Sequence, residues 1–200
     1  MNVIKIEEIG YQKIIACLRQ GGVIVYPTDT AYGLGCDATN EKACEKIFAI
    51  KGRDKGKTLS LIASDKEMVE DWLEFSDKAQ ELAKNYWHGA LGLVLPVKKE
   101  GLAPQVVQDG CAAVRVPDNI IARALSRELG APIVATSANE SGQGPCYSMD
   151  DVVKSLSTRA DKVAYGIDFG VLKEGEISTI AKVTASGVEV IRPGVIQLEN

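Results

Sequence analysis

The chain has 200 residues, of which 46% are hydrophobic, and this is enough apolar material for one sizeable core. We therefore predict a single domain over residues 1–200. The formal net charge of −4 at pH 7 excludes a general positive field for nucleic acid, so any site for a polyanion must be local. The sequence has no run of 18 apolar residues, and Glu7 and Glu8 stand where a signal peptide would need a positive end. We expect a cytoplasmic protein without membrane contact.

The cysteines and the single histidine exclude two further classes of site. The five cysteines are scattered and form no Cys-x-x-Cys pair, so neither a disulfide framework nor a zinc site is predicted. His88 stands between Trp87 and Gly89, two residues typical of a structural position. We therefore expect no metal held by the protein alone and no histidine base.

The first third of the chain predicts two helices around one strand. Apolar residues recur at helical spacing over 7–20 and over 40–50, and Gly52 is placed to end the second helix. Residues 22–26 are apolar and β-branched, which is typical of a buried strand, and Pro27 then removes a ladder donor.

The rest of the chain continues the alternation of strands and helices that is typical of an α/β fold. The expected elements are a strand over 58–63, helices over 64–75 and 76–86, strands over 90–97 and 111–117, a helix over 118–130, a strand over 132–136 and a helix from Ser148 to Leu156. Residues 177–184 and 188–191, around Ser186-Gly187, predict a β-hairpin.

Two polar loops follow apolar strands and are candidates for a site. Thr28, Asp29 and Thr30 come directly after the first strand, and glycines follow that let the backbone turn or approach a ligand. Residues 136–142 form a second polar loop after the strand over 132–136. Each loop alone is as well explained by ordinary turns. Two such loops favour a ligand site, because strand ends on one edge of an α/β sheet are where ligands bind.

Two groups of cations need an explanation. Arg115 lies in an apolar strand and is costly to bury unless an anion meets it, either an internal carboxylate such as Asp29 or a ligand carboxylate. A second, denser group of four cations follows the helix over 40–50. These are Lys51, Arg53, Lys55 and Lys57. They predict either an anion site or a solvated run that complements the helix dipole.

Six short motifs, taken in order and spacing, closely resemble those of the YrdC-type threonylcarbamoyl-AMP synthases in their short, single-domain form. The resemblance runs from about residue 21 to residue 194. The motifs are Pro27-Thr-Asp-Thr-x-Tyr-Gly-Leu-Gly35, Lys51-Gly-Arg53, Val114-Arg-Val-Pro117, Thr136-Ser-Ala-Asn139, Ser178-Thr-Ile180 and Arg192-Pro-Gly194.

The resemblance implies an α/β, YrdC-like domain whose twisted mixed sheet, flanked by helices, surrounds one open basic cavity. It also implies a nucleotidyltransferase reaction in which L-threonine, bicarbonate or CO2, and ATP with Mg²⁺ give threonylcarbamoyl-AMP and pyrophosphate. This product leads to N6-threonylcarbamoyladenosine in tRNA, so tRNA or a threonylcarbamoyl-transferase complex is an implied partner.

Residue by residue, the resemblance implies three groups of site residues. Lys51 and Arg53 are implied as catalytic. The nucleotide site would comprise Lys51, Arg53, Lys57, Asn139, Ser148 and Arg192. The threonine site would comprise Thr30, Arg115, Ser137 and Ser178.

The chain departs from the family pattern at several positions, and two other functions stay open. Asp54 and Thr58 stand where the family often has proline, Ile62 stands where some members have a threonine-contacting histidine, and residues 87–92 read Trp-His-Gly-Ala-Leu-Gly. One alternative is a double-stranded RNA-binding or tRNA-binding module of the same fold, against which the acidic net charge argues. The other is a paralogue with altered activity.

Overall fold

A computed structural model describes residues 1–54, 56–184 and 187–198 of the chain. Its framework is a ten-stranded mixed sheet in the order β1-β8-β2-β3-β7-β4-β6-β5-β9-β10. The strands are β1 (Asn2–Ile4), β2 (Ile24–Tyr26), β3 (Gly33–Gly35), β4 (Ser60–Ile62), β5 (Leu91–Pro96), β6 (Cys111–Arg115), β7 (Ile133–Ser137), β8 (Tyr165–Ile167), β9 (Thr179–Thr184) and β10 (Gly187–Arg192). The α/β fold with a mixed sheet is thus confirmed.

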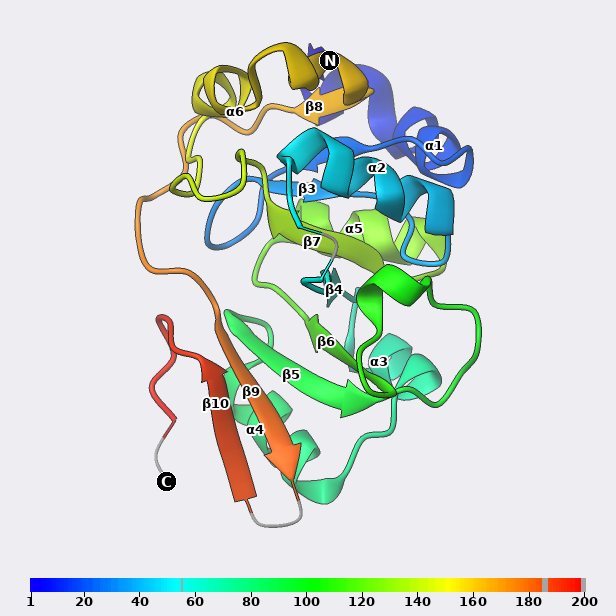
Figure 1. Cartoon of the computed structure of the whole chain (residues 1–200), viewed down its shortest axis with the longest axis vertical. Helices are drawn as coiled ribbons and strands as arrows, with labels where there is room; N and C mark the ends of the chain where they lie inside the picture. The colour runs from blue at the N-terminus through cyan, green and yellow to red at the C-terminus, as the bar shows by residue number, and fades with distance from the viewer. Residues whose placement is uncertain (55, 185–186, 199–200) are drawn as a thin grey trace.

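Six α-helices and two 3₁₀ helices accompany the sheet over the described ranges. They are α1 (Ile6–Arg19), α2 (Glu41–Lys51), α3 (Lys66–Trp72), α4 (Asp77–Tyr86), η1 (Pro104–Val106), α5 (Ile120–Leu129), α6 (Met149–Leu156) and η2 (Ser157–Lys162). Figure 1 shows α3, α4 and α5 behind the sheet, with α2 on the opposite side. The sheet therefore has helices on both faces, as an α/β architecture requires.

Local capping chemistry explains where the helices begin and end. The Asn40 side chain accepts a hydrogen bond from Ala43 N at the start of α2, and Gly52 closes the same helix in the left-handed conformation (φ 59°). Asp65 caps α3 and Asn119 caps α5. Both helices therefore begin slightly later than predicted, because these side chains reach the orphan N–H groups of the first turn.

Three short strands, β1, β3 and β8, lie outside the predicted elements. The glycines of β3 were expected in a loop, yet Gly35 lies opposite Ile24 in the sheet. A Cβ atom on Gly35 would come within 2.4 Å of Val134 O and 2.6 Å of Tyr26 Cε1. Glycine is therefore needed at this position because the buried Tyr26 ring and a neighbouring strand leave no room for a side chain. The sequence had predicted a different reason, a turn or the close approach of a ligand.

The C-terminal hairpin extends the sheet beyond β5. β9 pairs with β5 in parallel and with β10 in antiparallel orientation, with a register shift between Val190 and Arg192. The hairpin prediction is confirmed for the two strands, while Ser186 of the predicted turn lies outside the described residues. Figure 1 shows the segment between β8 and β9 running along one side of the sheet from its upper to its lower half.

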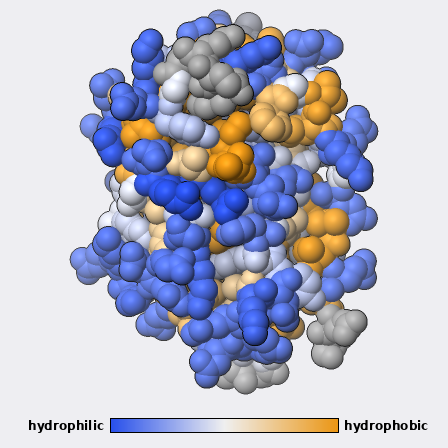
Figure 2. Space-filling view, turned by 180° about the vertical axis from the view of Figure 1, so that it is seen from behind, coloured by the Kyte–Doolittle hydropathy of each residue, from blue (hydrophilic) through white to orange (hydrophobic). Residues whose placement is uncertain are grey.

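The core is continuous along the sheet and the back face is polar. Fully buried side chains such as Ile24, Leu34, Leu61 and Leu93 come from both halves of the sheet. Figure 2 shows hydrophilic residues over most of the back face, with the hydrophobic ones in separate patches. Within the described ranges, no helix is both long and apolar enough to cross a bilayer.

Candidate functional site

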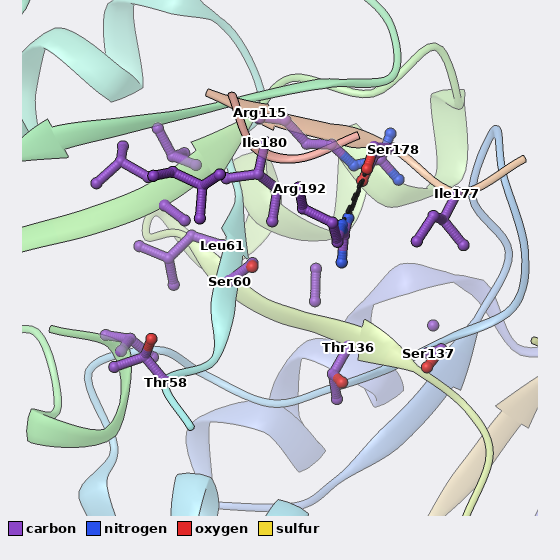
Figure 3. A pocket seen from close by; sticks show the side chains of 18 of the residues that line it. Thr58, Ser60, Leu61, Arg115, Thr136, Ser137, Ile177, Ser178, Ile180 and Arg192 are labelled. Atoms are coloured by element: carbon purple, nitrogen blue, oxygen red, sulfur yellow. Dashed lines mark hydrogen bonds between the residues drawn. The ribbon is translucent and has the colours of Figure 1, made fainter. Parts of the chain in front are cut away.

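One cavity of about 710 Å³ lies among the strands from β3 to β10. Six predicted site residues from distant parts of the sequence line it. They are Thr30, Arg53, Arg115, Ser137, Ser178 and Arg192. Figure 3 shows Arg115, Ile180, Ser178 and Arg192 together on one wall, with Thr136 and Ser137 facing them across the hollow. The fold therefore brings most of the predicted basic and hydroxyl groups to one place.

Strand register divides the cavity into two ends. Ile180 and Lys182 of β9, and Ser178 just before this strand, are two residues apart and all line the cavity. Lys182 lies opposite Val94, which in turn lies opposite Ala113. We call the part lined by Thr30, Arg115, Ser137 and Ser178 the arginine end. We call the part lined by Val94, Val106, Ala113, Ala135 and Lys182 the apolar end. The cavity thus passes from charged to mostly apolar walls.

Arg115 lies at the arginine end, where its side chain is 9% exposed. Its Nη1 donates to Asp29 Oδ1 at 2.5 Å and its Nη2 donates to Thr30 Oγ1 at 3.3 Å. The other Asp29 oxygen accepts from Asp118 N at 3.1 Å. The sequence left two possible partners for Arg115, an internal carboxylate such as Asp29 or a ligand carboxylate. In the structure Arg115 pairs with the internal carboxylate of Asp29. The fork predicted for a substrate carboxylate is therefore already half occupied by Asp29.

Arg192 lies on the same wall and is held against Ser178. It donates from Nη2 to Ser178 Oγ at 2.7 Å and from Nε to Ser178 O at 3.1 Å. Burial lowers the pKa of the Arg192 guanidinium, and the positive charges of Arg115 and Arg53 lower it further. A site that gathers three like charges is suited to an anion that offsets them.

Arg53 reaches the cavity from the loop that follows α2. Its Nη1 donates to Thr136 Oγ1 at 3.3 Å and its Nη2 donates to Thr58 O at 3.0 Å. Its Nε is buried and has no hydrogen-bond partner in the described part of the chain. Burial lowers the pKa of this guanidinium too. Arg53 is thus anchored through Nη1 and Nη2 and lies between the two ends of the cavity.

Lys51 and Asn139 do not line the cavity but support it from behind. The Lys51 ammonium donates to Ser137 O, to Asn139 O at 2.8 Å and to Asn139 Oδ1 at 3.2 Å. Lys51 is only 2% exposed, and burial followed by the charge of Arg53 lowers its pKa to about 8. The Asn139 amide nitrogen donates to Glu140 O and Gln143 O. Both residues therefore shape the loop after β7, and a direct contact of either with a nucleotide stays a prediction.

The other predicted nucleotide residues also lie outside the cavity lining. Ser148 caps α6, since its Oγ accepts from Asp151 N at 3.1 Å. Lys57 is exposed on the loop after α2, and Lys55 of the same basic run lies outside the described residues. The binding of a nucleotide by Lys57 and Ser148 therefore stays a prediction. For Lys57 to reach the cavity, the loop after α2 would have to move.

Several cavity residues were not singled out from the sequence. Asp109, Gln143 and Lys182 line the cavity and were not considered. Asp109 and Gly110 both have positive φ (51° and 71°) between the paired residues Gln108 and Cys111. The Asp-Gly pair is a strong signal for such a two-residue turn and could have placed Asp109 beside the strand that carries Arg115.

Comparison with known proteins gives relatives along almost the whole chain. The Sua5/YciO/YrdC family model, described as "Telomere recombination", matches residues 16–194. A threonylcarbamoyl-AMP synthase of Bacillus subtilis is 38% identical over 187 residues, which cover 92% of this chain and 53% of that protein. A putative threonylcarbamoyl-AMP synthase of Methanocaldococcus jannaschii is 33% identical, with 100% of this chain and 96% of that protein covered.

Solved structures agree with this fold and family. P. abyssi Sua5 complexed with L-threonine superposes with a TM-score of 0.86 at 33% identity, over 96% of this chain and 56% of that one. E. coli YciO superposes with a TM-score of 0.81 at 29% identity, over 92% and 89% of the two chains. The chain thus spans little more than half the length of the Bacillus relative and of Sua5. The chain belongs to the Sua5/YciO/YrdC family, because the family model covers most of its length and both the motifs and the fold match.

Proposed function

We propose that this protein is an L-threonylcarbamoyladenylate synthase, a nucleotidyltransferase that forms threonylcarbamoyl-AMP and pyrophosphate from L-threonine, bicarbonate or CO2, and ATP. The observation that carries the proposal is the convergence of Arg53, Arg115 and Arg192 with hydroxyl groups on one cavity. Support comes from the names of the relatives and from the P. abyssi Sua5 structure with L-threonine. The product would serve a tRNA-modifying transferase, which makes such a complex the expected partner.

The proposed reaction asks the protein mainly to hold two anions in line. The neutral amine of threonine adds to CO2 and loses a proton, which gives a carbamate. A carbamate oxygen then forms a bond to the α-phosphorus of ATP while the bond from that phosphorus to the bridging oxygen of pyrophosphate breaks. Because both reactants are negative, positioned cations lower the barrier by bringing them together and by offsetting the charge that develops on phosphate.

The two ends of the cavity fit the two halves of this product. Threonine would lie at the arginine end, where its carboxylate can approach the Arg115 guanidinium beside the contacts to Asp29 and Thr30. Its hydroxyl can bond Thr30 or Ser178. The α-phosphate would lie between the ends, beside Arg53 and Arg192. The unpartnered Nε of Arg53 supports this placement, because a buried donor without an acceptor is costly unless an acceptor arrives with the substrate.

Mg²⁺ would accompany the nucleotide in this proposal. Among the described residues, no group of three or more His, Cys, Asp or Glu side chains is placed to hold a metal ion. Mg²⁺ commonly takes its ligands from substrate phosphates and water with only one or two carboxylates, so these residues are compatible with an ion that enters with ATP. It would supply further positive charge at the phosphates.

The decisive experiment supplies the purified protein with ATP, L-threonine, bicarbonate and Mg²⁺. We expect pyrophosphate and a threonylcarbamoyl adenylate detected by mass spectrometry, with neither formed when threonine or bicarbonate is omitted. Absence of both products would contradict the proposal. Filter binding of tRNA over a range of salt concentrations tests the alternative of an RNA-binding module, which predicts tight binding that weakens steeply with salt.

A further inference from the structure

The apolar end of the cavity holds two charged side chains that the proposed reaction has not used. Lys182 and Asp109 both line the cavity. Neither side chain makes a hydrogen bond or ion pair with any residue in the described ranges, in contrast to Arg53, Arg115 and Arg192, which are all hydrogen-bonded to the protein. Glu189 lies opposite Lys182 in the β9–β10 register, but the two form no ion pair.

One wall beside these two charges is apolar, while Thr58, Ser60 and Gln108 also line the cavity. Gly92 lies opposite Ile180, and Val94 lies between Lys182 and Ala113 in the register of three neighbouring strands. Gly92 adds no side chain to this floor, and Val106 lines the cavity at the same end. A planar ring could lie on such a surface, because small and β-branched residues leave a slot without polar groups in its floor.

The positions of the charges along the cavity follow from strand geometry. Lys182 lies on β9, four residues beyond Ser178, the residue that precedes this strand, which corresponds to about 13 Å of extended chain. Asp109 is fixed at the turn that leads into β6, the strand whose other end carries Arg115. Both charges therefore lie at the far end of the cavity from the group that we assign to threonine.

We infer that Lys182 and Asp109 recognise the edge of the adenine base of ATP, an inference that rests on the proposed function. Threonylcarbamoyl-AMP is a linear molecule with the phosphate between its threonine and its base, so threonine at the arginine end places the base at the apolar end. Adenine presents an amino donor beside a ring-nitrogen acceptor. The Asp109 carboxylate accepts from the 6-amino group, and the Lys182 ammonium donates to N7, the ring nitrogen that stays an acceptor when the amino group is replaced by an oxo group.

This arrangement assigns different roles to the two charges. A nucleotide with a 6-oxo group in place of the amino group, such as ITP, would direct an acceptor at the Asp109 carboxylate and lose that hydrogen bond. A donor and acceptor pair of this kind discriminates between bases by roughly 5-fold to 150-fold. Lys182 contributes to the affinity for the nucleotide, while Asp109 sets the preference between ATP and ITP.

The test compares ATP with ITP in the full chain and in four variants. The variants are Asp109→Asn, Lys182→Met, and the matched controls Asp150→Asn and Lys42→Met, which replace exposed residues outside the cavity. The measurements are the dissociation constants of AMP and IMP by calorimetry, and kcat/KM for ATP and ITP with L-threonine and bicarbonate. A melting temperature for each variant confirms that it is folded.

We expect Asp109→Asn to reduce the preference for ATP over ITP by about tenfold, and Lys182→Met to raise the KM for ATP by about tenfold without changing the KM for threonine. The controls should match the unmodified protein. If both variants keep its nucleotide preference and affinities while product still forms, the inference is overturned and the proposed function stands. If the unmodified protein forms no product, the proposed function fails, and an equal affinity for AMP and IMP then overturns the inference as well.

Discussion

The two ends of the cavity differ in how much of their chemistry the protein has already arranged. At the arginine end, Arg115 is fixed by Asp29 and Arg192 is fixed by Ser178, so the positive groups are held before any ligand arrives. At the apolar end, Lys182 and Asp109 have no side-chain partner among the described residues. Preorganised charges are what an enzyme needs where charge develops, because they do not have to reorient during the reaction. Free charges on an apolar floor are better suited to recognition.

The residues that hold the cavity walls in place also lie mostly at the arginine end. Lys51 and Asn139 hold the loop that carries Ser137, and Asp29 holds Arg115. All of this support serves the arginine end and the region of Arg53. The apolar end depends instead on strand register and on the turn at Asp109. Mutations should therefore have large effects on turnover at the first end and smaller effects on nucleotide affinity at the second.

The largest expected effect is that of Arg53→Ala, which removes the cation between the two ends. We expect a loss of product formation on the order of 10² to 10³-fold, because one preorganised group that stabilises developing charge is worth about this much. The protein should stay folded, since Arg53 is anchored only to Thr136 Oγ1 and Thr58 O. The measurement is pyrophosphate release beside a thermal melt. Normal turnover in a folded variant would remove the charge-neutralisation argument.

The second prediction concerns the Arg115 and Asp29 pair at the arginine end. Arg115→Ala leaves a carboxylate with 12% exposure without its cation, and we expect the free energy of unfolding to fall by about 3 to 5 kcal/mol. The KM for threonine should also rise strongly. Asp29→Asn tests the contact from the other side, since Asn can keep a hydrogen bond to Arg115 without the charge.

A double-variant cycle separates stability from binding at this pair. Because the two side chains touch, the stability losses of Arg115→Ala and Asp29→Ala should not add. If Arg115→Ala lowers stability but leaves the KM for threonine unchanged, the arginine serves only as the internal partner of Asp29. That result would confine substrate binding at this end to Arg192 and the hydroxyl groups.

The sequence predicted elements well where local chemistry decides them. Helix α2 was predicted with its end at Gly52, because apolar spacing and a left-handed glycine are local signals. The partner of Arg115 could only be narrowed to two anions, since Asp29 is 86 residues away and tertiary structure makes the choice. Strand β3 was missed because its glycines are typical of a loop and only the packing around Tyr26 shows why they stand in a sheet.

The sequence predicted which residues line the site better than it predicted their contacts. Six of the ten predicted residues line one cavity, because the motifs carry the resemblance residue by residue. The burial of Lys51 could not be foreseen from a run of charges that is equally typical of a solvated surface. It depends on the loop of Ser137 and Asn139, which supplies carbonyl acceptors from a different part of the fold. Asp109 and Lys182 belong to no motif that the sequence brought out.

The third prediction uses the lowered pKa of Lys51. Because this pKa is about 8, the ammonium loses a proton above that pH and with it one of three donors to the loop after β7. We expect turnover to fall by up to about tenfold as the pH rises from 7 to 9, whereas Lys51→Met should be weakly active at every pH and show no such fall. The measurement is the pH profile of kcat/KM for both proteins.

The sign of the stability effect makes this pH test specific. The unfolded chain keeps Lys51 protonated up to its ordinary pKa of 10.5, so between about 8 and 10.5 the unfolded state binds more protons than the folded state. The contribution of Lys51 to the free energy of unfolding therefore rises with pH in this window. A loss of activity there that follows Lys51 cannot come from its effect on global stability, and an identical fall in Lys51→Met would assign the titration to another group.

The smallest effect is expected from Gly92→Ala, which adds one methyl group to the floor of the apolar end. A Cβ atom at Gly92 would lie 3.5 Å from Ile180 Cγ1 and from Thr179 O, an ordinary contact distance, so the strand should accept it without strain. The methyl group would raise the KM for ATP by less than about tenfold, since one methyl in an apolar pocket is worth roughly 1 kcal/mol at the low end of the usual range. Gly175→Ala, whose Cβ would meet open space outside the cavity, is the matched control. An increase in the KM for threonine in place of ATP would mean that the two ends are assigned the wrong way round, because only the substrate that lies over β5 can be affected by this methyl group.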